Sequence, residues 1–178
     1  EGYWFGLTVR ARVLAYSRER VDPSELSTYE ALADPIWRGR VLTRSSENVY
    51  NISLLASLIA ANGTEAAEAW AQAVVQNFGR APQGGDRDQV LDVAAGVGDI
   101  AIVNTYYVGQ LLNDPDMAVR DLASQVGIFF PNQRGRGAHA NVSGAGVTAN
   151  APNPVNATRL IEFLVSEEAQ RSFAETVY

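Results

Sequence analysis

A short apolar strand that passes directly into a helix constrains the fold of this chain more than any other segment. The four residues at 100–103 are apolar and mostly β-branched, and they follow Gly98-Asp99. Such a run predicts a short buried strand. Asn104 and Thr105 are good N-cap residues, and apolar residues at 108, 111 and 112 recur after them at helical spacing. This strand-to-helix step is the unit from which α/β sheets are built.

The same alternation recurs along the chain. Strands are predicted at 7–16, 39–43, 100–103 and 125–130, and helices are predicted to begin near residues 50, 64, 86, 105, 155 and 166. Strand 7–16 has one apolar face and a second face that carries arginines, while Asp86 is interpreted as a helix cap. The predicted fold class is therefore α/β, with at least one sheet that is largely parallel.

Three tyrosines are the candidate ligands. Tyr106 and Tyr107 lie where strand 100–103 ends, and Tyr50 has the equivalent place after strand 39–43. Helix starts in neighbouring βα units lie at the same sheet edge, which is where ligands bind in open α/β sheets. Phenolate is a hard anionic oxygen donor that suits ferric iron, whereas softer metals prefer sulfur or imidazole. Alternatively, the three rings pack in the ordinary way and place their hydroxyls at the surface.

Composition excludes several classes of function. The 178 residues suffice for one large domain or two small lobes, and 47% of them are hydrophobic. The chain has no cysteine, so disulfides, zinc fingers and thiolate-held clusters are excluded. All 14 basic residues are arginine, which excludes Schiff-base and P-loop lysine chemistry. The net charge of −6 argues against nucleic acid and anionic membranes as partners.

Catalysis and membrane insertion are also disfavoured. No Ser-His-Asp, Cys-His, paired-carboxylate or Gly-rich phosphate motif stands at the predicted sheet edge, so we expect no enzyme. No apolar run has the length of a membrane span, and the first residues lack the features of a signal peptide. The chain starts within an apolar segment and stops without a polar tail, so we expect a fragment of a longer protein.

Several segments resemble the periplasmic ferric-iron-binding proteins of ABC importers. They lie at 4–8, 26–35, 37–41, 44–51, 98–107, 144–147 and 160–164, so the likeness extends over essentially the whole chain. Its most specific motifs are the Tyr106-Tyr107 pair and the Asn48-Val49-Tyr50-Asn51 helix start, which resemble the cyanobacterial-type branch.

The resemblance implies a two-lobed fold of the periplasmic binding protein class II type, here mostly the second lobe with part of the first. Residues 1–12 would be a hinge or first-lobe strand, 13–131 the second lobe with the tyrosines, and 132–178 a partial return to the first lobe. The family draws further ligands from the missing portion of the first lobe, so the metal site in this chain would be incomplete.

The resemblance also implies a site and a function. Tyr106 and Tyr107 match the paired ligands, Tyr50 matches the third tyrosine, and Arg10 matches a hinge-strand arginine that can balance charge or hold a synergistic anion. His139, the single histidine, does not match the family's histidine ligand and is interpreted as a loop residue. The implied protein is a periplasmic or lipid-anchored monomer that binds Fe³⁺ as cargo and delivers it to an ABC permease in the inner membrane.

One alternative keeps the fold and changes the ligand. The chain could be a solute-binding protein for a small oxyanion or a polyamine. An anion site would use Ser45, Ser46 and helix N–H groups, with the tyrosines only shaping the cleft. In a further alternative the chain is a structural lobe that binds little or no iron apart from its missing portion.

Overall fold

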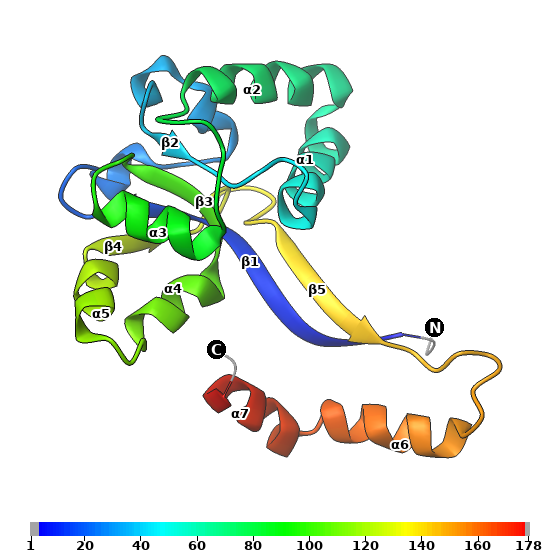
Figure 1. The fold of residues 1–178 in the computed structure, drawn as a ribbon. Coiled ribbons are helices and arrows are strands. Elements are labelled where there is room, and N and C mark those ends of the chain that lie inside the picture. Colours follow the sequence, from blue (N-terminus) through cyan, green and yellow to red (C-terminus); the bar gives the residue numbers. More distant parts are fainter. Residues whose placement is uncertain (1–3, 177–178) are drawn as a thin grey trace. The chain divides into compact units, whose positions relative to one another are not determined.

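The computed structural model describes residues 4–176 (Figure 1). The chain consists of two compact units. The first unit comprises Glu1–Arg10 and Ala140–Tyr178, and the second comprises Ala11–His139. Because the first strand continues across the boundary after Arg10, both units contain part of it. No helix among residues 4–176 is both long enough and apolar enough to cross a bilayer.

The second unit holds most of the regular structure. In chain order its elements are the later part of β1 (Phe5–Ser17), the 3₁₀ helices η1 (Pro23–Glu25), η2 (Glu30–Ala33) and η3 (Pro35–Trp37), β2 (Val41–Leu42), α1 (Val49–Asn62), α2 (Thr64–Gln76), α3 (Asp86–Ala94), β3 (Ile100–Asn104), α4 (Thr105–Leu112), α5 (Met117–Ser124) and β4 (Val126–Phe129). The predicted alternation of strands with helices is therefore present, although β2 is shorter than its predicted range of 39–43.

The central sheet is mixed, and the prediction of a largely parallel sheet is wrong for β1. The strand order is β2-β3-β1-β4, with β2 parallel to β3 and β1 antiparallel to both β3 and β4. A crossover helix makes successive strands parallel, but β1 enters this unit with no helix of the unit before it. The direction of β1 is therefore not fixed by a βα connection, and the alternating pattern in the sequence is the same for either direction.

Both faces of the sheet are buried (Figure 1). On one face Leu14 and Tyr16 of β1 pack with α1 and α2, and on the other Val13 and Ala15 pack with α3, α4 and α5. Successive strand residues point to opposite faces, so Arg12 lies on the same face as Leu14 and Tyr16. The face that carries arginines in the sequence is therefore buried from position 12 onward, and Arg12 is 0% exposed.

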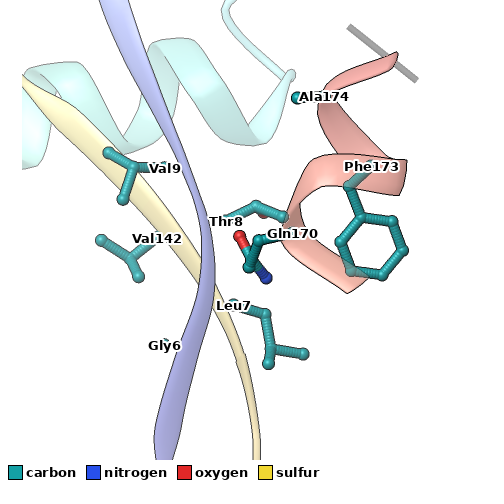
Figure 2. A pocket seen from close by; sticks show the side chains of 8 residues that line it. All are labelled: Gly6, Leu7, Thr8, Val9, Val142, Gln170, Phe173 and Ala174. Atoms are coloured by element: carbon teal, nitrogen blue, oxygen red, sulfur yellow. The ribbon is translucent and has the colours of Figure 1, made fainter. Parts of the chain in front are cut away.

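The first unit contains the start of β1, β5 (Ala140–Ala145), α6 (Pro154–Leu164) and α7 (Glu167–Thr176). β5 pairs with β1. A cavity of about 370 Å³ lies in this unit, and Figure 2 shows Gln170 of α7 reaching toward β1 there. The lining residues carry no titratable side chain: Gly6, Leu7, Thr8, Val9, Val142, Gln170, Phe173 and Ala174. This cavity therefore lacks the anionic oxygens that a hard metal ion requires.

Candidate metal centre

The candidate site lies at the edge of the sheet where β2 and β3 end. α1 begins at Val49 after the turn that follows β2, and it carries Tyr50 in its first turn. α4 follows β3 without a break and carries Tyr106 and Tyr107 in its first turn. Because β2 and β3 are parallel neighbours, both helix starts lie at the same edge of the sheet.

Local sequence explains why both helices begin at these points. The Asn48 side chain accepts a hydrogen bond of 3.0 Å from the Tyr50 N–H, which is the usual N-cap arrangement. Asn104 is the N-cap residue of α4, as the sequence predicts, but its side chain makes no capping hydrogen bond. That side chain is instead used elsewhere in the site.

The three phenols come together. The Tyr106 and Tyr107 rings lie with their centroids 4.0 Å apart and their planes inclined by 32°. Burial raises the pKa of Tyr106 well above its ordinary value, and hydrogen bonds with the Tyr107 and Tyr50 side chains raise it further. Tyr106 is therefore protonated at neutral pH, and its side chain interacts with those of both Tyr107 and Tyr50.

A buried ion pair supports this edge of the sheet. Arg12 Nη1 lies 2.6 Å from Asp86 Oδ2, and both side chains are 0% exposed. The same guanidinium donates to Asn51 Oδ1 at 2.6 Å and to Asn104 Oδ1 at 3.3 Å. Its central carbon lies 5.8 Å from the centroid of the Tyr50 ring. Burial lowers the pKa of Arg12, while Asp86 opposes that shift.

Sequence reasoning missed this ion pair. The interpretation of Asp86 as a helix cap is wrong, because Gly85 is the N-cap residue of α3 and the Asp86 carboxylate faces Arg12. The one available signal was the alternation of side chains along the strand, which puts Arg12 on the same face as the apolar Leu14 and Tyr16. That signal indicates burial but does not identify a partner.

The structure also places two further residues considered from the sequence, Arg10 and His139. Arg10 belongs to the first unit, where its guanidinium donates to Thr8 Oγ1 at 3.2 Å and to Ser143 Oγ. His139 is half-buried, with Nε2 3.1 Å from Ser53 Oγ in α1. Among residues 4–176, no group of three or more His, Cys, Asp or Glu side chains is placed to hold a metal ion.

The fold is that of a solute-binding protein. The chain belongs to the bacterial extracellular solute-binding protein family, whose model matches residues 1–178. Iron uptake protein A1 of Synechocystis sp. is 54% identical over 178 residues, which cover 100% of this chain and 49% of that protein.

Solved structures agree with this assignment. The structure described as Trichodesmium (IdiA) (FutA) in complex with iron and citrate ligands is 51% identical, with a TM-score of 0.93 over 97% of this chain and 54% of that one. Apo FutA2 from Synechocystis PCC6803 is 53% identical, with a TM-score of 0.91 over 97% of this chain and 55% of that one. The chain thus spans about half the length of each. These matches confirm the predicted resemblance and the α/β fold of the class II type, and the first of the relatives is described as an iron uptake protein.

Proposed function

We propose that this chain belongs to the solute-binding component of an importer that captures ferric iron through tyrosine phenolates. The observation that carries the proposal is the meeting of the Tyr50, Tyr106 and Tyr107 side chains at one sheet edge. Its context supports iron as the cargo, because the chain is 54% identical to an iron uptake protein. Delivery to a membrane permease from a periplasmic location is part of the same proposal, as is a monomeric state of the intact protein.

The chemistry of the phenols suits a trivalent hard cation. A free phenol has a pKa of about 10, so an ion that binds it at neutral pH must displace the proton. Three phenolates would balance the charge of Fe³⁺, and binding would release protons and weaken in acid.

Three phenolates would leave coordination positions of the ion vacant, so further groups would take part. Arg10 is proposed as the residue that balances charge or holds a small synergistic anion. The amino ends of α1 and α4 carry partial positive charge, which also favours an anion next to the metal. Closure of a hinged pair of lobes around the ion would then present the loaded form to the permease.

Spectroscopy on the intact protein tests the proposal. Addition of ferric citrate should produce a visible tyrosinate-to-iron charge-transfer band with release of protons. The double substitution Tyr106→Phe/Tyr107→Phe should abolish the band and leave the far-UV circular dichroism unchanged. Tyr16→Phe is the matched control, because Tyr16 is buried in the sheet core and should not affect the colour.

Two outcomes would contradict the proposal. A band that survives the double substitution would show that other side chains bind the iron. A colourless protein that phosphate or sulfate stabilises against heat would favour the oxyanion alternative, in which Ser45, Ser46 and helix N–H groups bind the anion. Stabilisation by a polyamine instead would favour the polyamine alternative.

A further inference from the structure

A buried polar cluster connects the two segments that carry the tyrosines. Its members are Arg12, Asn51, Asp86 and Asn104, and we refer to them as the Arg12 cluster. We propose that Arg12 is a positioning residue that holds the start of α1 and the start of α4 at a fixed separation, so that the phenols converge on one ion. This inference rests on the proposed function.

The guanidinium reaches both α1 and β3. Nη2 donates to Asn51 Oδ1 at 2.6 Å, and Asn51 directly follows Tyr50 in α1. Nη1 donates to Asn104 Oδ1 at 3.3 Å, and Nη2 donates to the Ile102 carbonyl at 3.2 Å, both in the strand that leads into the Tyr106-Tyr107 helix. One side chain therefore ties both helix starts to β1.

Asp86 completes the link from a third element, α3. Its Oδ2 accepts from Arg12 Nη1 at 2.6 Å and from the Asn104 N–H at 2.8 Å. The Asn51 amide extends the connection on the other side, since Nδ2 donates to Thr43 Oγ1 at 3.1 Å and to the Arg44 carbonyl at 2.9 Å. The turn between β2 and α1 is thus joined to the same cluster.

The backbone of Arg12 is also held in place. Its N–H donates to the His139 carbonyl at 2.8 Å, and its carbonyl accepts from Tyr29 Oη at 2.6 Å. A guanidinium is a planar fork with donors in fixed directions, whereas an ammonium is a compact charge without that geometry. A lysine at position 12 would keep the charge beside Asp86 but could not bond Asp86, Asn51 and Asn104 together.

Arg40 provides a matched control at the opposite end of β3. Its Nε lies 2.6 Å from Asp99 Oδ2, and its guanidinium lies 4.9 Å from the Trp37 ring centroid. Arg40 therefore has the same kinds of partner as Arg12, a carboxylate and an aromatic ring. Asp99 directly precedes β3, whereas the tyrosines follow it, so Arg40 does not contact the helix starts.

The test compares Arg12→Lys with Arg40→Lys in the intact protein, titrated with ferric citrate. Arg12→Lys should weaken ferric binding by about 10- to 100-fold, the usual effect of losing a group that orients metal ligands. It should also shift the maximum of the charge-transfer band, because the phenolate geometry changes. Arg40→Lys should stay within about threefold of the unsubstituted protein, as expected for a partly exposed pair, and keep the band maximum.

A second variant and an iron-free measurement keep the outcome decisive. Asn51→Ala removes one arm of the cluster at a half-buried position and leaves the Arg12–Asp86 pair intact, so it should lower affinity in the same direction even if Arg12→Lys fails to fold. Amide hydrogen exchange should become faster at Asn104 in Arg12→Lys, because an ammonium without the guanidinium fork holds Asp86, the acceptor of the Asn104 N–H, less firmly in place.

The results that overturn the inference are distinct from those that overturn the function. If Arg12→Lys, or Asn51→Ala where the former does not fold, matches Arg40→Lys in affinity and band maximum, Arg12 does not position the phenols while iron binding stands. If the unsubstituted protein shows no band at all, the proposed function fails, and the positioning role fails with it.

Discussion

Replacing Asp86 by alanine should destabilise the second unit much more than replacing Asp99 by alanine. Each of these carboxylates faces two arginines: Asp86 faces Arg12 and Arg44, and Asp99 lies 2.6 Å from both Arg20 and Arg40. The two sites differ in burial. Asp86 is 0% exposed, whereas the side chain of Asp99 is 17% exposed. The comparison therefore isolates the effect of desolvation on an ion pair.

The expected magnitudes follow from that difference. Asp86→Ala leaves the Arg12 guanidinium buried without its carboxylate, and breaking a buried pair in this way costs about 3–5 kcal/mol. The Asn104 N–H also loses its acceptor, which raises the loss further. In Asp99→Ala the freed arginines are about one-third exposed and can turn to water, so the expected loss is about 1 kcal/mol.

Urea unfolding followed by circular dichroism and tryptophan fluorescence measures both losses. With a slope of about 2–3 kcal/mol per molar urea, Asp86→Ala should lower the unfolding midpoint by about 1–2 M, and Asp99→Ala by less than about 0.5 M. Equal shifts in the two variants would refute the argument that burial of the Arg12–Asp86 pair decides its importance.

Two further predictions concern other parts of the second unit. Burial alone would raise the pKa of Glu30, but hydrogen bonds from Asn132 and Arg136 help to lower it from 4.5 to about 2. Its contribution to the free energy of unfolding is about 1 kcal/mol after solvent screening. This contribution should be complete above about pH 5 and be lost as the pH falls toward 2. In pH-dependent urea unfolding, the stability of Glu30→Gln should therefore fall less over this range than that of the unsubstituted protein. Gly127→Ala places a methyl group against the Tyr16 ring across the β1–β4 pair and should lower stability by about 1–3 kcal/mol; an unchanged urea midpoint would argue against this packing.

The sequence alone determined the local elements and the placement of the tyrosines. The apolar run before Asn104 and the helical spacing after it are short-range signals, and β3 and α4 form where they predict. Asn48 acts on its own helix, so the start of α1 beside Tyr50 is likewise encoded within a few residues. The expectation that Tyr50 and Tyr106 share a sheet edge needed only two neighbouring βα units.

Tertiary structure decided the direction of β1 and the support beneath the phenols. A period of two is the same for parallel and antiparallel strands, so only pairing with β3 and β4 reveals that β1 runs antiparallel. Arg12 and Asp86 lie 74 positions apart, and neither residue's neighbours encode the other. Their partnership arises because the assembled sheet removes both charges from water, where each becomes stable only with the other beside it.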